Sequence, residues 1–320
     1  MVTRAPGIHS TSAFASEYHA PALVAEVVAL LGGCALVLDG TLGGGGHSAA
    51  LLGAGVRRVA GVDRDPDALA AASARLALEA ADGRFSAHRG NYADIGRIGA
   101  LDALRFDGIL LDLGISSHQV DDASRGFSFR EGAPLDMRMD DERPSAADLL
   151  NTAADAELVA IFRDYGDEPH AARLAREVVR RRATRPFVSA DDLVGAIRGA
   201  LGARTGPPEF ARLFQAVRIA VNDELAGLER ALPTLRDRLA PGGRLAILSY
   251  HSGEDRLVKH AFRQWSEACI CPPRHPMCSC GGDRALGSVL TKRAVVATSG
   301  ETAANARARS AKLRAWQRAA

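Results

Sequence analysis

An acid, five glycines and a histidine lie together in the nine residues Asp39-Gly-Thr-Leu-Gly-Gly-Gly-Gly-His47. Apolar residues at 35–38 and 49–52 flank them, which predicts a strand, a loop and then a helix. Glycine has no Cβ and tolerates positive φ, so such a loop can lie against a ligand, and the helix that follows begins with free N–H groups. A second acid, Asp63, ends the next apolar run, and an acid at the carboxyl end of a parallel strand typically holds ribose hydroxyls.

This glycine loop lacks the spacing of the two common phosphate-binding loops. A P-loop ends in Gly-Lys-Ser/Thr, but His47 follows Gly46, and no glycine from 40 to 46 begins a G-x-G-x-x-G motif. The remaining pattern, an acid followed by a glycine-rich stretch, is close to the loop of methyltransferases that use S-adenosylmethionine. That cofactor has ribose hydroxyls and no phosphate. The alternative is a tight strand–helix turn without a ligand. In that case no ligand contact would offset the conformational entropy that five glycines lose on folding.

A third acid, Asp112, ends the apolar run 108–111. In a doubly wound sheet this strand lies beside the glycine loop, so Asp112 is placed where a methyl donor and its acceptor would meet. Gly114, Ser116 and Ser117 are small enough to let a planar base approach, and Gln119 offers both a donor and an acceptor to an adenine or methionine edge. The alternative is a polar loop capped by Asp112.

The elements that position these acids alternate between strand and helix. Strands are predicted at 35–39, 58–63, 84–88, 108–112 and 241–249, and helices at 22–31 and 66–80. Further strands are predicted at 289–297 and 311–317. This order indicates an α/β fold with a doubly wound, Rossmann-like sheet, and the glycine loop favours the class I methyltransferase type of that sheet.

Only helices are predicted between the fourth and fifth strands, at 145–150, 156–165, 169–182, 189–200 and 213–239. A block of helices between two parts of one sheet indicates an inserted domain. We therefore expect a cofactor-binding domain at 1–121 and 209–320, and an inserted helical domain for substrate recognition at 122–208.

Positive charge comes almost entirely from arginine, because lysine occurs only at 259, 292 and 312, and the net charge is only +2. Arginines concentrate at 173–185 and again, with Lys312, at 307–318. Basic clusters on a nearly neutral protein favour a partner with a phosphate backbone. A solvated helix face, in a chain rich in alanine, glycine and arginine, is the alternative.

Four of the five cysteines form two C-x-C pairs, Cys269 with Cys271 and Cys278 with Cys280. The four could bind zinc, but the usual knuckle is C-x₂-C, so the sequence leaves the metal unknown. Disulfides are the alternative, less favoured in a cytosolic chain. We expect the cytoplasm, since residues 1–18 do not read as a signal peptide and no apolar run is long enough to span a membrane.

With these motifs in view, the chain resembles the bacterial 16S ribosomal RNA (cytosine-N4) methyltransferase family almost end to end. The motifs that carry the resemblance are His19-Ala-Pro-Ala-Leu23, Asp39-Gly-Thr-Leu-Gly43, Gly45-Gly-His-Ser48, Asp63-Arg-Asp65, Asp112-Leu-Gly-Ile-Ser-Ser117, Arg125-Gly-Phe-Ser-Phe129, Leu135-Asp-Met-Arg-Met-Asp140, Phe214-Gln-Ala-Val-Arg-Ile-Ala-Val-Asn-Asp-Glu-Leu225, Ser249-Tyr-His-Ser252, Glu254-Asp-Arg256 and Arg307-Ala-Arg-Ser-Ala-Lys-Leu-Arg314. The chain departs from the family pattern at Asp167, Gly253 and Ala306, which lie outside the glycine loop.

The resemblance implies methylation at N4 of a cytosine in the decoding centre of 16S ribosomal RNA, the family target being cytosine 1402, with S-adenosyl-L-methionine as cofactor. It implies the small ribosomal subunit as partner and no membrane, and it leaves a homodimer open. The cofactor contacts implied are Gly45, Gly46, His47, Asp63, Tyr92, Asp112 and Gln119. Asp112 is the candidate catalytic residue. Two other functions stay open at this stage: a methyltransferase acting on a protein or small molecule, and a non-catalytic RNA-binding assembly factor.

Overall fold

The computed structural model describes residues 20–269, 271 and 278–320, and it divides into two compact units. Unit 1 consists of the described residues up to Gly114 together with Gly227–Ala320, and unit 2 is Ile115–Ala226. Residues 1–18, for which no signal peptide is expected, lie outside the described residues, as does His19, the first residue of the motif at 19–23.

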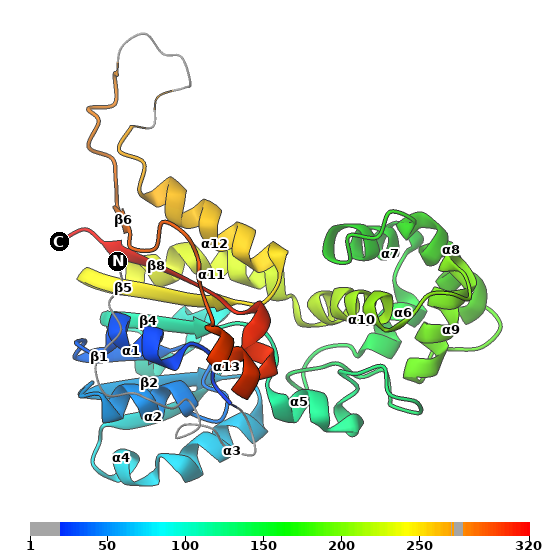
Figure 1. The fold of residues 1–320 in the computed structure, drawn as a ribbon, viewed down its shortest axis with the longest axis horizontal. Helices are drawn as coiled ribbons and strands as arrows, with labels where there is room; N and C mark the ends of the chain where they lie inside the picture. The colour runs from blue at the N-terminus through cyan, green and yellow to red at the C-terminus, as the bar shows by residue number, and fades with distance from the viewer. Residues whose placement is uncertain (1–19, 270, 272–277) are drawn as a thin grey trace. The chain divides into compact units, whose positions relative to one another are not determined.

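Unit 1 is built on a mixed sheet with the strand order β3-β2-β1-β4-β5-β8-β6 (Figure 1). The five strands from β3 to β5 run parallel. The sixth, β8, is antiparallel to β5, and the short strands β6 and β7 pair with β8. The strand bounds are β1 (Leu36–Asp39), β2 (Arg58–Asp63), β3 (Phe85–Arg89), β4 (Phe106–Asp112), β5 (Leu239–Ser249), β6 (Gly287–Val289), β7 (Val295–Val296) and β8 (Lys312–Arg318).

Helices cover both faces of this sheet. Neighbouring residues of β4 enter two different cores: Leu110 packs with residues of α1, α2 and α3, whereas Ile109 and Leu111 pack with residues of α11 and α12. This alternation is the signature of a strand buried on both faces, and it confirms the predicted doubly wound α/β fold. The helix bounds are α1 (Val24–Leu31), α2 (Gly46–Gly53), α3 (Pro66–Arg75), α4 (Ala77–Ala81), α11 (Glu224–Arg238), α12 (Ser252–Trp265) and α13 (Ser299–Ala304). Short 3₁₀ segments occupy Tyr92–Arg97, Gly99–Leu101 and Ala306–Ser310.

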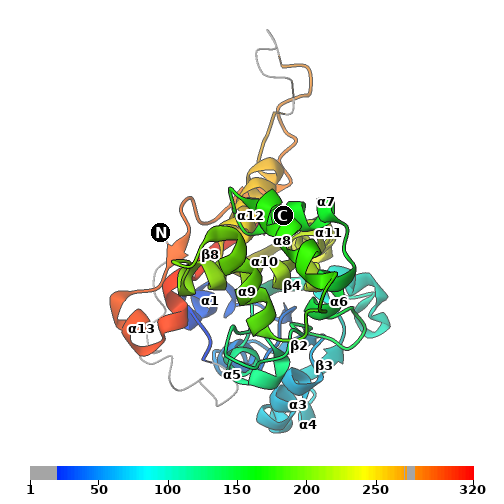
Figure 2. The same cartoon turned by 90° about the vertical axis from the view of Figure 1, so that its right-hand side faces the viewer.

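Unit 2 is helical and has its own hydrophobic core. Its helix α8 packs against α7 and α9, and α10 packs against α6 (Figure 2). Its helices are α5 (Ser117–Asp121), α6 (Ala146–Thr152), α7 (Asp155–Ala160), α8 (Ala171–Arg182), α9 (Ala190–Leu201) and α10 (Pro207–Asn222), with a 3₁₀ turn at Ala123–Arg125 and a π-helical turn at Ile161–Tyr165. The predicted insertion, 122–208, falls inside this unit. The unit extends past both predicted boundaries, because Ile115 packs against this core before residue 122 and apolar residues of α10, among them Phe210 and Phe214, belong to it after residue 208.

Three predicted elements differ from the structure. The helix predicted at 66–80 breaks at Leu76, whose φ of −108° leaves the helical region. The helix predicted at 213–239 is two helices, α10 and α11, separated by Asp223 in the left-handed conformation with φ of +52°. The strand predicted at 289–297 is two short strands, because the buried Thr291 between them uses its side-chain oxygen to accept a hydrogen bond from the Ala315 amide at 2.9 Å.

Among the described residues, no helix combines the length and apolar character needed to cross a bilayer.

Candidate active site

The glycine loop is tied to the two strands that flank β1. The Gly40 amide donates to the Leu110 carbonyl at 2.9 Å, and the Leu42 amide donates to the Val62 carbonyl at 3.0 Å. Since β1 pairs in parallel with β2 and with β4, the carboxyl ends of all three strands meet at one edge of the sheet. The loop and the acids predicted from the sequence are therefore neighbours.

The glycines of this loop serve two different purposes. A Cβ on Gly40 would lie 2.6 Å from a side-chain carbon of Leu111, so Gly40 is required for packing. Gly45 adopts a φ of +73° at the start of α2, and a Cβ there would crowd α3 at 3.3 Å. Gly43, with a φ of +49°, would meet no atom within 4 Å. The backbone at Gly43 therefore faces open space, as expected of the part of a loop that touches a ligand.

Asp63 fixes this loop to the end of β2. Its carboxylate accepts hydrogen bonds from the Gly43 amide at 2.8 Å and from the Asp65 amide at 2.9 Å. Burial raises the pKa of Asp63 to about 6, and these two hydrogen bonds oppose that rise. Each carboxylate oxygen keeps a second lone pair, so Asp63 can still accept from two ribose hydroxyls.

Asp112, at the end of β4, is held by side chains from other elements. Its Oδ1 accepts a hydrogen bond from the Tyr250 hydroxyl at 2.7 Å, and its Oδ2 lies 3.5 Å from the His47 Nδ1. Its own amide donates to the Thr41 hydroxyl at 2.6 Å. Burial and the neighbouring Asp112 charge raise the pKa of Tyr250 well above its ordinary value, so the phenol stays protonated and donates. A phenol that donates to a carboxylate makes a charge-assisted bond, which fixes the carboxylate orientation.

His47 is oriented by the backbone. Its Nε2 lies 2.9 Å from the Ala22 carbonyl oxygen, which can only accept, so Nε2 carries a proton. The Nδ1 atom then donates to Asp112 only when the ring also holds a second proton. The structure thus brings His47 and Asp112 together, while the hydrogen bond that positions the acid comes from Tyr250.

The other predicted cofactor residues lie on two different units. Gly46 begins α2 beside Gly45. Tyr92 begins the 3₁₀ segment after β3 and lies next to the glycine loop, because a Cβ added to Gly40 would be 3.2 Å from the Cβ of Tyr92. Gln119 lies in unit 2, where its side chain accepts from the Ser116 amide at 3.0 Å and completes a capping box on α5. A contact between Gln119 and a cofactor stays a prediction.

Sequence reasoning missed the partners of two acids. Asp39 does not face the loop's open side: it accepts from the Ser48 hydroxyl at 2.7 Å and so joins β1 to α2. Burial raises the pKa of Asp39, and the Ser48 hydrogen bond opposes that rise. Tyr250, the partner of Asp112, follows β5, the next parallel strand along the sheet, and the Ser249-Tyr-His-Ser252 motif was the available signal for it.

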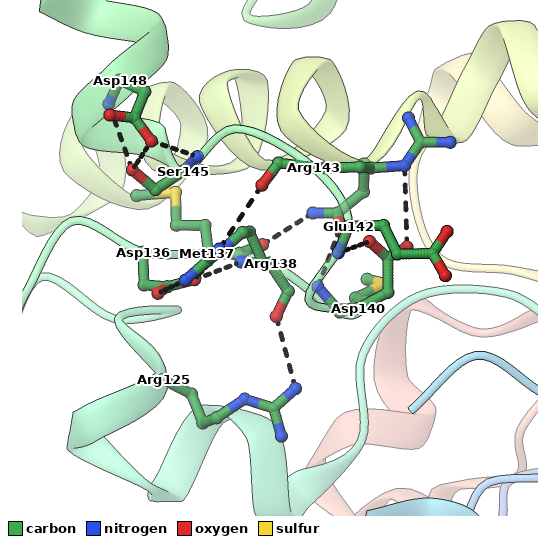
Figure 3. Close-up of polar contacts among 11 residues, drawn as sticks. Arg125, Asp136, Met137, Arg138, Asp140, Glu142, Arg143, Ser145 and Asp148 are labelled. Atoms are coloured by element: carbon green, nitrogen blue, oxygen red, sulfur yellow. Dashed lines mark hydrogen bonds and ion pairs between the residues drawn. The ribbon is translucent and has the colours of Figure 1, made fainter. Parts of the chain in front are cut away.

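In unit 2 the motif residues form a hydrogen-bonded loop (Figure 3). The Asp136 carboxylate accepts two bonds from the Arg138 guanidinium at 2.7 and 2.9 Å, and Arg125 donates to the Arg138 carbonyl at 3.3 Å. Burial raises the pKa of Asp136, but the bonds and charge of Arg138 outweigh it and leave that pKa below its ordinary value. Between them, Met137 is fully buried with a φ of +60°, a strained conformation for a non-glycine residue.

The arginine clusters divide into structural and exposed members. Arg182 donates to the Leu150 and Ala153 carbonyls at 3.0 and 2.7 Å, and Arg218 makes two bonds to Glu224 at 2.8 and 2.9 Å. Those two side chains are engaged within unit 2. In the C-terminal cluster of unit 1, Arg314 is engaged with Asp255 at 2.6 and 3.2 Å.

As far as the structure describes the chain, the other arginines of α8 do not bond to backbone carbonyls as Arg182 does. Arg180 and Arg181 both bond to Glu177. These bonds lower the pKa of Glu177 to about 2, and the bond from Arg180 has the largest effect. Arg173 and Arg176 are exposed, and no ion pair reaches either of them within the part of the chain that the structure describes. These two are the strongest candidates in unit 2 for contact with an acidic partner.

The model of one protein family matches residues 16–319, nearly the whole chain, and it is described as the MraW methylase family. The chain belongs to this family. A relative from Gemmatimonas aurantiaca, named ribosomal RNA small subunit methyltransferase H, is 63% identical over 303 residues, which cover 94% of this chain and 96% of the relative. Relatives of the same name from Heliobacterium modesticaldum and Myxococcus xanthus are 48% and 47% identical, each over 94% of this chain and over 98% and 97% of their own lengths.

Two solved structures align with this chain at low sequence identity. An rRNA methylase from Streptococcus thermophilus aligns over 92% of both chains with a TM-score of 0.39 and 12% identity. TrmN from Thermus thermophilus aligns over 92% of this chain and 48% of its own, with a TM-score of 0.40 and 13% identity. Scores this low support no conclusion about this chain.

Proposed function

We propose that this member of the methylase family transfers a methyl group from S-adenosyl-L-methionine to N4 of a cytosine in the decoding centre of 16S ribosomal RNA. The observation that carries the proposal is the Asp112 carboxylate, fixed by Tyr250 at the end of β4 and next to the glycine loop. The shared name of the relatives, which refers to ribosomal RNA of the small subunit, supports the substrate.

The residues of unit 1 fit this cofactor. Asp63 offers free lone pairs at the end of β2, the open side of Gly43 leaves room for a ligand against the backbone, and Tyr92 stands after β3 with a ring able to stack on adenine. No lysine occurs in the loop, in keeping with a ligand that has no phosphate. When bound, S-adenosyl-L-methionine supplies an electrophilic methyl group.

The chemistry left to the chain is to orient a weak nucleophile. The lone pair of the cytosine amino group is conjugated with the ring, and an acceptor for one N4–H would draw it out of conjugation. Asp112 is suited to that role, because its carboxylate lies at the end of β4 and the Tyr250 hydroxyl fixes its orientation through Oδ1. Holding the acceptor in line supplies much of the acceleration, so we assign Asp112 as an orienting acceptor rather than a strong base.

Exposed arginines of unit 2 would meet the RNA backbone. Arg173 and Arg176 are exposed on α8, whereas Arg182 and Arg218 are held in structural bonds. Contacts to phosphate position an RNA without reading its sequence. The target base must also be unstacked before its amino group can reach a carboxylate at the end of a strand.

The test is methylation of small ribosomal subunits purified from a strain that lacks this enzyme. Wild-type protein with labelled cofactor should produce N4-methylcytidine, mapped to the decoding centre by nuclease digestion and mass spectrometry. Asp112→Ala should lower kcat/KM by about 100-fold or more, whereas Asp237→Asn, an exposed acid, should not. Label in a protein or small molecule would replace the RNA assignment, and cofactor binding without turnover would favour an assembly factor.

A further inference from the structure

The two C-x-C pairs lie on a segment that leaves the sheet domain and returns to it. Residues 266–286 connect α12 to β6, and Figure 1 shows the described arms of this segment extending away from the sheet. The arms are joined at their base, where the Leu286 amide donates to the Trp265 carbonyl at 2.8 Å and the Arg284 amide donates to the Ala268 carbonyl at 2.9 Å. They form a hairpin-like projection.

This projection has no core of its own. Among its described residues, 266–269, 271 and 278–286, none is buried. A segment that buries no apolar surface cannot offset the entropy of ordering its backbone, so small projections of this kind usually need a disulfide or a metal as a cross-link. The cysteines lie where such a cross-link would act, at the far end of the described arms.

The four sulfur atoms converge on one point. All four lie within 4.8 Å of one another. The Cys278 Sγ lies 3.6 Å from the Cys269 Sγ and 3.5 Å from the Cys280 Sγ, and the Cys280 and Cys269 sulfurs are 3.7 Å apart. Four thiolates that each bind zinc at about 2.3 Å in a tetrahedron lie about 3.8 Å apart. A disulfide requires about 2.05 Å, and in an iron–sulfur cluster the cysteines bind different irons and stand farther apart.

From this convergence we propose that Cys269, Cys271, Cys278 and Cys280 form a structural site for one Zn²⁺ ion, which cross-links the tip of the projection. The sulfurs of both C-x-C pairs take part in this convergence, so each arm supplies two of the four ligands. A closed site of four protein ligands leaves no position for water or substrate, so its role is structural.

Neighbouring groups support thiolates at this point. The Ser279 amide donates to the Cys271 sulfur at 3.4 Å, a contact of the kind that orients metal-bound ligands. Four thiolates and one Zn²⁺ carry two negative charges in excess, and the Arg284 guanidinium, which donates to the Cys280 carbonyl at 2.9 Å, brings a positive charge beside them. The site is independent of the methyl-transfer residues, none of which lies on this segment.

The fifth cysteine provides a matched control. Cys34 is half-buried in the sheet domain, and burial raises the pKa of its thiol to about 11, so it is a poor metal ligand. The comparison is between wild type, Cys34→Ser, and a double variant with Cys271→Ser and Cys280→Ser, which removes one ligand from each arm.

Full-length protein purified under reducing conditions, without chelator or a metal-affinity tag, should contain about one zinc per chain by elemental analysis. Cys34→Ser should keep that zinc, and the double variant should lose it. Cobalt added to metal-free wild type should give the intense visible bands of a tetrahedral tetrathiolate, and X-ray absorption of the zinc form should show four sulfurs at about 2.3 Å. These two spectra need no variant, so a double variant that fails to fold would not weaken the test.

Two results would overturn the site. Wild type that binds no zinc after reduction and reconstitution, or a double variant that keeps its full zinc content, would contradict it. Thiol titration after unfolding in chelator distinguishes the zinc site from two disulfides. With a zinc site all five cysteines should react, whereas two disulfides would leave only Cys34 reactive.

Discussion

Replacing Asp63 with asparagine tests the cofactor assignment most sharply, because it changes a single oxygen to an NH₂ group and should alter both the affinity for the cofactor and the pH dependence of that affinity. Asparagine keeps the shape of the side chain but removes its charge and one of its two acceptor oxygens. In wild type these oxygens accept from the Gly43 and Asp65 amides. In Asp63→Asn one of the two amides must therefore face an NH₂ group and lose its partner.

The cost to stability can be worked out from the pKa. Burial raises the pKa of Asp63 from 3.8 to about 6 in the folded protein, a difference of about 2.2 units, so the ionised carboxylate costs at most about 3 kcal/mol at neutral pH. The folded state binds the proton more tightly, so this carboxylate makes wild type less stable as pH rises from about 4 to about 6. Asp63→Asn lacks that cost but leaves one amide unpaired, at about 1–3 kcal/mol. The two changes nearly cancel at neutral pH, and the variant should fold.

Cofactor affinity, unlike stability, should change strongly. A charge-assisted bond to a ribose hydroxyl contributes about 1.5–3 kcal/mol, so Asp63→Asn and Asp63→Ala should each raise the Kd for S-adenosyl-L-methionine about 10–150-fold at neutral pH. In wild type the Kd should also rise as pH falls below about 6, because protonation removes the charge that the hydroxyls need. In Asp63→Asn that pH dependence should disappear.

The assay is calorimetric titration of the cofactor at several pH values from about 5 to about 8, with chemical unfolding of the ligand-free proteins at the same pH values. Asp107→Asn is the matched control, since Asp107 also accepts from two backbone amides, those of Ala35 and Leu36, but lies near the start of β4, away from the glycine loop. A variant at Asp63 that binds as tightly as wild type, or that keeps the wild-type pH dependence, would refute the ribose assignment.

Three further outcomes are expected. Tyr250→Phe removes the bond to Asp112, so kcat/KM should fall about 10–150-fold while calorimetry finds cofactor affinity unchanged; a loss of affinity instead would contradict the orienting role. Replacing Arg173 and Arg176 with alanine should weaken RNA binding and reduce its salt slope by up to about 2, measured by filter binding, and an unchanged slope would make α8 an ordinary solvated face. Asn222→Ala should lower the free energy of unfolding by about 2–4 kcal/mol in denaturant titrations, because its buried amide bonds to Met137 and Met139 backbone groups are lost, and a smaller change would mean that water replaces them.

The parallel strands and the positions of their acids could be predicted because local pattern decides them. An apolar run ended by an acid predicted β2 and Asp63 to the residue, and it placed Asp112 at the end of β4. The break at Asp223 carries no glycine, so nothing local distinguishes it from the helix on either side. The bond between Asp112 and Tyr250 joins residues 138 positions apart, and only the pairing of β4 with β5 brings them together.

The two acids at the sheet edge are held by different kinds of partner, and that difference fits their proposed roles. Asp63 accepts from two backbone amides, which substitutions other than proline leave in place and which join the glycine loop to the carboxylate. Such an acid is suited to binding, where loop and ligand must be fixed together. For Asp112, the carboxylate accepts a hydrogen bond from a side chain, the phenol of Tyr250, which follows β5. Because Tyr250 lies outside the glycine loop, the Asp112 orientation can be changed at that residue without moving the cofactor loop, as an acceptor for a reacting amino group requires. Substitutions of Tyr250 should consequently separate turnover from cofactor binding, whereas substitutions of Asp63 should not.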